Sequence, residues 1–512
     1  MNLEGLLEGL GGFGRYQIIL TITLGYSKIV VVPTMLMMTF AGVEPDWWCT
    51  SHDINLSQWN RSHLSGSYQN CSWDGTCDRK FSDAMVTVVS EWNLVCDKSW
   101  VSNAIISIQM VGVLIGCIIA GYCADRYGRK NVFYSGLLWL FLGNIVSAFS
   151  VSWIMFTVVR TFLGMACGLI LGTLYLYQIE FVGTKWRVFI ASLPEWPLGM
   201  VILCLLAKWL HNWKWLHLAT AALTFPYLFT WFFAPESVRW LVVKGRLEDA
   251  RTVIRKMAEL NMKPMPDTSI LELIAEGEKA EGDKAKCYSY LDLLKTKEQA
   301  TKTVISCFLW LACSVVYYAI TFGLKDLSGD IYFNMLLMAL TEFPATPCIL
   351  LISVFGRRVG VASCFLLTAA VCFGLAASAS VAPADEKGNY INACAFTGKF
   401  IITVGWLVAM TLCAEQFPTV IRNLAFAAQN SGARVGGILA GQILSLGGHK
   451  DLMVPFIALG ILVSLAAVAT FGLEETSGKA LEDTMNPFTQ ETTEKGYLLQ
   501  QKASGESRDN RK

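Results

Sequence analysis

The stretch that decides the fold is Gly121-Tyr122-Cys123-Ala124-Asp125-Arg126-Tyr127-Gly128-Arg129-Lys130, a charged glycine turn between two apolar runs. Each run is long enough to cross a bilayer. A weaker copy, Phe355-Gly356-Arg357-Arg358, again falls between two long apolar runs, and Gly356 lies 228 positions after Gly128. The chain therefore consists of two related halves. An internal repeat of membrane helices is typical of a transporter.

The composition excludes a chain of soluble domains. Of 512 residues, 54% are hydrophobic and only 16% are charged, and the net charge of +1 indicates neither nucleic acid nor an acidic partner. Helices that are apolar all round belong in lipid. Runs near the ~20 residues needed to span hydrocarbon occur at 16–40, 100–122, 131–150, 153–177, 188–207, 215–233, 303–322, 331–354, 359–381, 391–413, 424–446 and 453–473. The predicted fold is an all-α integral membrane protein with twelve transmembrane helices in two pseudo-symmetric six-helix bundles.

The runs divide the chain into four parts. Residues 1–233 form the N-terminal bundle, which includes a long extracellular loop at 41–99, and residues 234–302 form a cytoplasmic linker with short helices. The C-terminal bundle follows at 303–473 and a polar cytoplasmic tail at 474–512. The first run has no small-residue cleavage site, so we interpret it as a retained span. The fifth run is interrupted by Pro194 and Pro197.

Basic residues set the predicted orientation. They gather in the short loops of one side, at Arg126, Arg129, Lys130, Lys185, Arg187, Arg357 and Arg358. The positive-inside rule makes that side cytoplasmic. An even number of spans then places both termini in the cytoplasm, in a multi-pass protein of the plasma membrane.

The loop at 41–99 carries the marks of an extracellular segment. Its three glycosylation acceptor patterns begin at Asn55, Asn60 and Asn70. It also contains an even set of cysteines, Cys49, Cys71, Cys77 and Cys96, which allows three pairings. We expect two disulfides here, with their connectivity open. The other cysteines show no metal-ligand spacing, and small hydrophobic packing explains most of them.

Five local motifs resemble one known family. They are Val89-Ser90-Glu91-Trp92-Asn93-Leu94-Val95-Cys96, Glu180-Phe181-Val182-Gly183-Thr184-Lys185-Trp186-Arg187, Pro235-Glu236-Ser237-Val238-Arg239-Trp240-Leu241, Glu415-Gln416-Phe417-Pro418-Thr419-Val420-Ile421-Arg422-Asn423 and Glu474-Glu475-Thr476-Ser477-Gly478-Lys479. With them the chain resembles, nearly end to end, the organic cation, anion and carnitine transporters (solute carrier family 22) of the major facilitator superfamily. The glycine turn and the third and fifth motifs also fit a sugar porter. The extracellular loop and the first two motifs favour solute carrier family 22 over a sugar porter.

Paired opposite charges at the cytoplasmic ends of the spans predict an inner gate. We expect the arginines to reach carboxylates across the inner surface and the ion pairs to break when the gate opens. The predicted gating residues are Asp125, Arg126, Arg129, Glu180, Arg187, Glu236, Arg239 and Glu415. The alternative is that these charges only fix topology and anchor helix ends.

Ionisable residues inside the spans are the candidates for substrate binding, because they are costly in hydrocarbon and usually face a cavity or a partner. There are six, Lys28, Arg160, Glu195, Glu342, Lys399 and Arg434. Arg434 heads them, since Asn430, Arg434, Gly437, Gly441 and Ser445 form a polar or small stripe at helical spacing. The predicted substrate-binding residues are Arg434, Glu342, Lys399, Trp406, Tyr317 and Lys28. The alternatives are that the lysines extend to an interface, that the rings are core, that Arg160 is structural and that Glu342 pairs with Arg434 or Lys399 only to stabilise the bundle.

The resemblance implies the sign of the substrate. In the family, the position of Arg434 is usually acidic in cation carriers and basic in anion and carnitine carriers, while Glu342 follows the cation and carnitine pattern. Together they fit a zwitterion. The predicted function is polyspecific organic-ion transport by alternating access, for carnitine-like or betaine-like zwitterions or organic anions. The alternatives are an organic cation transporter, a neutral-solute porter and a non-transporting receptor.

No sequence feature indicates an enzyme. The chain has no nucleotide-binding glycine loop, catalytic triad or metal site, so no cofactor is expected and gradients should drive transport. The coupling ion, sodium or proton, stays open, as does the oligomeric state. The expected partners are a small organic ion and the lipid bilayer.

Overall fold

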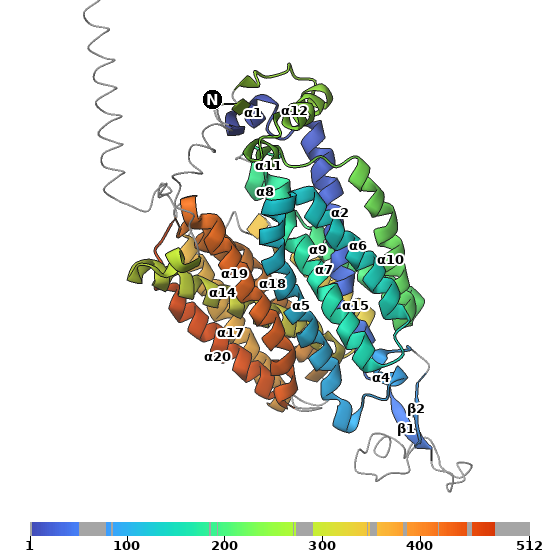
Figure 1. Cartoon of the computed structure of the whole chain (residues 1–512). Coiled ribbons are helices and arrows are strands. Elements are labelled where there is room, and N and C mark those ends of the chain that lie inside the picture. The colour runs from blue at the N-terminus through green and yellow to red at the C-terminus, as the bar shows by residue number, and fades with distance from the viewer. Residues whose placement is uncertain are drawn as a thin grey trace, which may run out of the picture.

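Long helices packed side by side make up almost all of the computed structural model (Figure 1). It describes residues 3–50, 78–82, 85–183, 186–191, 193–269, 271–272, 290–345, 347–348, 356–381, 387–417, 419–447 and 453–476. Within these ranges, eight helices are long and apolar enough to cross a membrane.

Each of the twelve predicted spans coincides with a helix. In the N-terminal half these are α2 (Arg15–Leu36), α5 (Trp100–Tyr127), α6 (Arg129–Ala148), α7 (Trp153–Ile179), α9 (Glu195–Leu210) and α10 (Trp213–Leu228). In the C-terminal half they are α14 (Lys297–Phe322), α15 (Ile331–Glu342), α17 (Arg357–Val381), α18 (Lys387–Glu415), α19 (Thr419–Leu444) and α20 (Met453–Thr470). Figure 1 shows the two sets as neighbouring bundles.

The fifth and eighth predicted spans depart most from the helices described for them. The run at 188–207 is split into α8 (Arg187–Ala191) and α9, which begins after Pro194. Proline has no N–H to donate to the preceding turn and clashes with its carbonyl, so a helix begins more easily after it than across it. The run at 331–354 gives α15, which ends at Glu342, and most of its remainder lies outside the described residues.

Glycines let α5 and α7 cross at close range. A Cβ added to Gly112 would lie 2.1 Å from the Thr161 carbonyl oxygen, and one added to Gly164 would lie 2.2 Å from the Gln109 carbonyl oxygen. Side chains at these positions would force the helices apart. Gly164 and Gly168, one helical turn apart on α7, therefore form part of its contact with α5.

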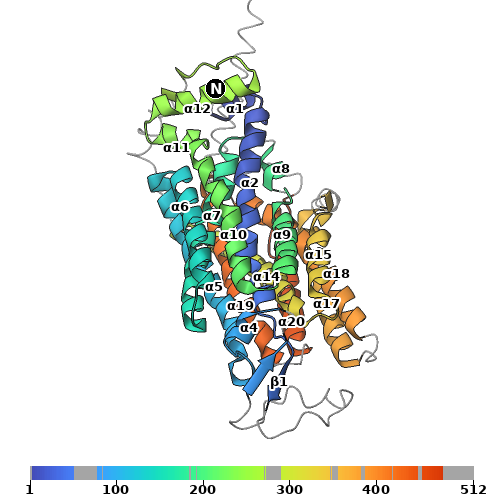
Figure 2. The same cartoon turned by 90° about the vertical axis from the view of Figure 1, so that its right-hand side faces the viewer.

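Short elements cover the two ends of the bundles (Figure 2). At one end lie α1 (Leu3–Gly9), α11 (Val238–Val243) and α12 (Leu247–Asn261). The antiparallel strands β1 (Trp47–Thr50) and β2 (Asp78–Phe81) lie at the other end, with α4 (Val88–Glu91). Cys96 is disulfide-bonded. The predicted glycosylation sites at Asn55, Asn60 and Asn70 lie outside the described residues, as do Cys71, Cys77 and the side chain of Cys49.

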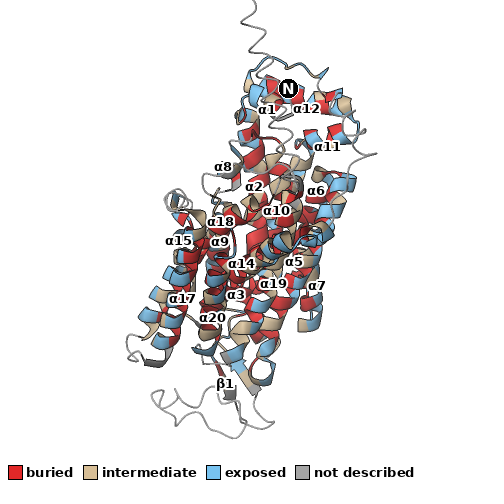
Figure 3. Cartoon of the chain, turned by 90° about the vertical axis from the view of Figure 1, so that its left-hand side faces the viewer, coloured by how far each residue is buried: buried red, intermediate tan, exposed pale blue. Residues whose placement is uncertain are grey.

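The outward faces of the helices are apolar. Figure 3 shows buried residues along the middle of the bundles and exposed ones on their outer surfaces. Many of the exposed side chains are large and apolar, for example Ile118, Val158, Leu366 and Val468. In water this would be a very large hydrophobic patch, whereas lipid tails suit it.

The halves are joined by neutral hydrogen bonds at the end that carries the strands. The Asn103 amide at the beginning of α5 donates to the Ser445 hydroxyl, 2.9 Å away, just beyond the end of α19. One turn further along α5, the Ser107 hydroxyl donates to the Ile438 carbonyl at 2.9 Å and accepts from the Gln442 amide at 3.0 Å. In this structure the two bundles are therefore in contact at the end that carries the strands, which the sequence predicts to be the outer end.

Candidate functional site

The glycine turn between α5 and α6 is built around Gly128. Its φ is +100°, in a region that L side chains rarely adopt. A Cβ at this position would lie 2.2 Å from the Glu236 Oε2. Glycine is therefore required here both by the backbone and by the neighbouring carboxylate.

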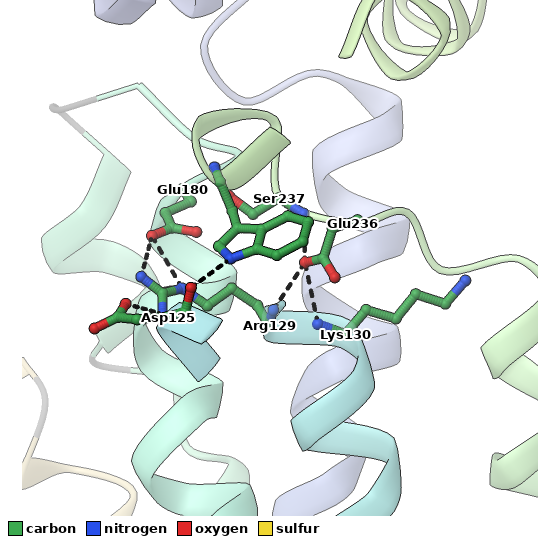
Figure 4. Close-up of polar contacts among 7 residues, drawn as sticks. Asp125, Arg129, Lys130, Glu180, Glu236 and Ser237 are labelled. Atoms are coloured by element: carbon green, nitrogen blue, oxygen red, sulfur yellow. Dashed lines mark hydrogen bonds and ion pairs between the residues drawn. The ribbon is translucent and has the colours of Figure 1, made fainter. Parts of the chain in front are cut away.

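Glu236 caps the first turn of α6 (Figure 4). Its Oε1 accepts the backbone N–H groups of Arg129 at 2.9 Å, Lys130 at 3.2 Å and Ser237 at 2.9 Å. Burial raises the pKa of the Glu236 carboxyl, and these N–H groups oppose that shift because they stabilise the anion. A carboxylate at a helix N-terminus also interacts favourably with the helix dipole.

The Arg129 side chain joins three helices. It pairs with Asp125 on α5 at 2.6 Å and with Glu180, which follows α7, at 3.4 Å. On the other side, the Trp240 indole donates to the Asp125 carbonyl at 2.9 Å, so α11 is attached to the same corner (Figure 4). The side chains of Arg129 and Glu180 are only 13% and 10% exposed, so this pair is partly shielded from water.

The C-terminal half repeats this arrangement. Gly356 has a φ of +94°. Glu475 accepts the backbone N–H groups of Arg357 at 2.9 Å and Arg358 at 3.0 Å. The Arg357 side chain pairs with Glu415 at the end of α18. Gly356, Glu475, Arg357 and Glu415 thus occupy the roles of Gly128, Glu236, Arg129 and Glu180.

The pairing differs from the prediction for three gating residues. Glu415 pairs with Arg357 of its own half, whereas the prediction gave it an arginine across the inner surface. Arg126 is exposed. Its guanidinium donates to the hydroxyl of Tyr122, one helical turn earlier on α5, at 2.9 Å and makes no ion pair with the described residues. Arg239 is exposed on α11 and makes no ion pair with the residues that the structure describes.

Arg187 begins α8 and is partly buried close to Tyr175. The ion pairs of Arg129 lie within the N-terminal half, and that of Arg357 lies within the C-terminal half.

A buried ion pair lies in the C-terminal bundle. The Lys399 Nζ is 3.1 Å from the Glu342 Oε1 and donates to the Thr321 hydroxyl at 2.7 Å. The Tyr317 hydroxyl donates to the same Glu342 oxygen at 2.6 Å, and its ring lies 3.0 Å from the Lys399 Nζ. The side chains of Lys399 and Glu342 are 0% and 5% exposed. Glu342 is therefore matched by Lys399, not placed opposite Arg434, and this was the pairing that the sequence left as an alternative.

Aromatic rings continue from this pair toward the glycine turns. Trp406 meets Tyr317 edge-on with ring centroids 5.6 Å apart, and Trp310 lies 6.2 Å from Trp406. The Phe426 ring meets the Trp310 ring edge-on, with centroids 5.4 Å apart, and stacks on the Tyr175 ring of α7, with centroids 5.5 Å apart. The last contact joins the two halves near the ends that carry the glycine turns.

Two predicted charges in the N-terminal half also have partners. Lys28 pairs with Glu195 at 2.7 Å, because α9 begins at Glu195 and packs against α2. Arg160 is fully buried and donates to the Gln109 amide oxygen, within the close crossing of α5 and α7. Its Nε and Nη1 have no hydrogen-bond partner, and its contacts with Gln109 and the Phe156 ring lie inside one bundle.

Arg434 is different, because it lies between the halves. Its guanidinium lies close to Tyr318 on α14 and Cys117 on α5, and its Nε has no hydrogen-bond partner. Among the described residues, Arg434 has no carboxylate partner. A partly buried cation without a carboxylate partner among the described residues, at the junction of two helix bundles, is a candidate for binding an anionic group.

Known proteins share this sequence and fold. The family model described as sugar (and other) transporter matches residues 55–488. The human organic cation/carnitine transporter 2 is 31% identical over 88% of this chain and 78% of its own. The Drosophila melanogaster organic cation transporter-like protein is 29% identical over 95% of this chain and 92% of its own. The chain belongs to solute carrier family 22.

The fold of this solute carrier matches solved members of the major facilitator superfamily. The inward-open xylose transporter XylE of E. coli superposes with a TM-score of 0.60 at 16% identity, covering 93% of this chain and 97% of that one. This likeness confirms the all-α, two-bundle membrane fold. The family also confirms a transporter and not an enzyme.

Sequence reasoning missed part of the carrier's inner corners. Arg357 was used only to predict the orientation, and Glu475 only as part of the fifth motif. The repeat of the glycine turn at Gly356 already indicated that both belong to a second corner. Applying the repeat residue by residue would have paired Arg357 with the carboxylate that ends the tenth span.

Proposed function

We propose that this carrier moves zwitterionic or anionic organic solutes across the plasma membrane by alternating access, with both termini in the cytoplasm. Membership of a family whose relatives are named organic cation and carnitine transporters supports an organic-ion substrate. The sign of the substrate rests on Arg434 and its surroundings.

The observation that carries the proposal is the unmatched charge of Arg434. Of the six ionisable residues in the spans, Lys28, Glu195, Lys399 and Glu342 form two ion pairs, and Arg160 is enclosed in one bundle. Arg434 alone among them contacts both halves and has no carboxylate within the described residues. A carboxylate of the substrate would supply the missing counter-charge through a two-pronged pair.

Aromatic rings favour a substrate that also carries a cationic group. Tyr317, Trp406 and Trp310 lie along one path beside the Glu342–Lys399 pair. Ring faces bind quaternary ammonium groups. A betaine-like solute would use Arg434 for its carboxylate and these rings for its ammonium group, and the same rings support organic cation transport as the second candidate.

The polar clusters around the glycine turns at Gly128 and Gly356 support movement of each half as a unit. Arg129 and Glu236 attach α5, α6, α7 and α11 to one another, and Arg357 with Glu475 does the same in the other half. Ion pairs within a half keep it rigid, whereas the halves meet at one end through neutral hydrogen bonds and at the other through stacked rings. Such a division suits rocking of one bundle against the other.

Uptake by cells expressing the chain tests the proposal. A labelled betaine, a dicarboxylate and a quaternary amine are compared with and without sodium, each normalised to surface protein. Arg434→Gln should weaken uptake of the betaine and the dicarboxylate by about tenfold or more, since a hydrogen bond to a charged group contributes about 1.5–3 kcal/mol. The quaternary amine should be spared, and Arg434→Lys should be intermediate.

The matched control is Arg126→Gln, which removes an exposed arginine in the last turn of α5. Equal losses for all three substrates in Arg434→Gln would contradict charge recognition at this residue. Uptake of the quaternary amine alone by the unaltered chain would favour the second candidate.

A further inference from the structure

We propose that a basic pocket beside the glycine turn binds the anionic headgroup of a phospholipid in the cytoplasmic leaflet. The inference goes beyond transport of the solute and depends on the orientation that the positive-inside rule gives. It concerns a cavity of about 360 Å³ at the end of the molecule that carries α11 and α12.

The pocket lies where several elements of the N-terminal half meet the linker. Its walls include Tyr16 of α2, Lys130 of α6 and Trp231, which follows α10. The linker supplies Arg246 and Lys256. An occupant would therefore contact both the membrane helices and the amphipathic helix α12.

Positive charge dominates the pocket. Lys130, Arg246 and Lys256 line it, and Glu236 is the one carboxylate among its lining residues. Glu236 is already engaged by three backbone N–H groups, and Arg246 is paired with Asp249 at 2.7 Å. Lys130 and Lys256 form no ion pair with the part of the chain that the structure describes.

The geometry of Lys130 leaves its ammonium group available. Figure 4 shows its side chain extending away from the Arg129 cluster, although its backbone N–H belongs to that cluster. The Nζ lies 4.9 Å from the centre of the Trp231 ring. A phosphate between Lys130 and Lys256 would relieve the repulsion between the two ammonium groups, which face the same cavity.

The rim of the pocket indicates a lipid in preference to a soluble phosphate. Phe232 and Phe233 line the cavity and are 76% and 86% exposed, and Phe229 one turn earlier is 52% exposed. They follow directly on α10, a predicted span, so they lie at the level where aromatic side chains meet lipid headgroups. Basic residues beside such a belt attract the anionic lipids of the cytoplasmic leaflet.

Binding assays on the full-length protein in detergent test the proposal. The probes are a short-chain phosphatidylserine, the matching phosphatidylcholine and inorganic phosphate, with the shift in melting temperature as the readout. Phosphatidylserine should stabilise the protein, and the other two probes should not. The double variant Lys130→Gln with Lys256→Gln should weaken phosphatidylserine binding by about twentyfold or more.

The control double variant is Arg255→Gln with Lys263→Gln, which removes the same charge from exposed positions of the linker that do not line the pocket. It should bind phosphatidylserine like the unaltered protein. Lys130→Arg with Lys256→Arg keeps both charges and should retain binding, which separates loss of charge from misfolding.

Three results would overturn the proposal. These are equal stabilisation by phosphatidylserine and phosphatidylcholine, equal weakening in the two Gln double variants, or equal affinity for inorganic phosphate and phosphatidylserine. The last would assign the pocket to a soluble anion.

Discussion

Two features of Gly128 disfavour alanine. Its φ is positive, and a Cβ would lie 2.2 Å from a carboxylate oxygen of Glu236. This positive-φ backbone, essentially reserved for glycine, costs another residue about 1–3 kcal/mol, and the clash would also push Glu236 off the first turn of α6. We expect Gly128→Ala to lower uptake severalfold at equal surface expression. Gly121→Ala is the control, because its Cβ would meet nothing within 4 Å. Equal uptake by the two variants would contradict this reading of the turn.

The Glu342–Lys399 pair predicts strong coupling between two buried residues. Glu342→Gln or Lys399→Met alone should destabilise the protein by about 3–5 kcal/mol, since each leaves a buried charge without its partner. The double variant should recover much of that loss. Thermal unfolding of the purified protein measures all three. Additive losses in the double variant would show that the two side chains act independently.

Sequence reasoning found the charged residues at this scale but not all of their partners. Arg434, Glu342 and Lys399 stand out because charge is rare within apolar runs. Which carboxylate meets which cation depends on how helices rotate and pack. Lys399 contacts Glu342 and Thr321 from two other helices, and a single sequence does not specify those rotations.

Among the elements, the corner of α5, α6 and α7 should depend on Arg129 and not on its neighbour Arg126. Arg129→Gln removes ion pairs to Asp125 and Glu180, while Arg126→Gln removes one exposed hydrogen bond to Tyr122. We expect the first to reduce the maximal uptake rate severalfold and the second to leave it nearly unchanged. Uptake at saturating substrate, normalised to surface protein, compares them. Matching losses would indicate that only the positive charge of the loop matters.

Helix prediction succeeded where apolar length decided the outcome and was less accurate where proline did. Continuous runs such as 153–177 and 453–473 gave helices with similar bounds. The run at 188–207 has enough apolar residues to span, but Pro194 moved the beginning of α9 to Glu195. Opposite charges at helix ends can be paired in many ways, so the sequence does not specify which arginine meets which carboxylate. The fold shows that Arg129 and Arg357 each pair with a carboxylate of their own half.

For the whole molecule, the outer contact between the halves predicts an effect of cross-linking. Asn103→Cys with Ser445→Cys replaces two side chains that are hydrogen-bonded at 2.9 Å. If the outer ends must separate during transport, oxidation of this pair should abolish uptake and reduction should restore it. Each single cysteine variant serves as the control under the same oxidation. Unchanged uptake after verified cross-linking would contradict alternating access through this end.

The neutrality of that outer contact has a kinetic consequence for the empty carrier. Asn103, Ser107, Gln442 and Ser445 are all uncharged, so water can satisfy each group once the ends part. Because each hydrogen bond contributes only about 0.5–1.5 kcal/mol net, we expect the unloaded protein to change between its proposed outward-facing and inward-facing states by thermal motion. Solute preloaded on the far side should then accelerate uptake little. Strong trans-stimulation would instead mean that the return of the empty carrier limits turnover and that some further contact holds it closed.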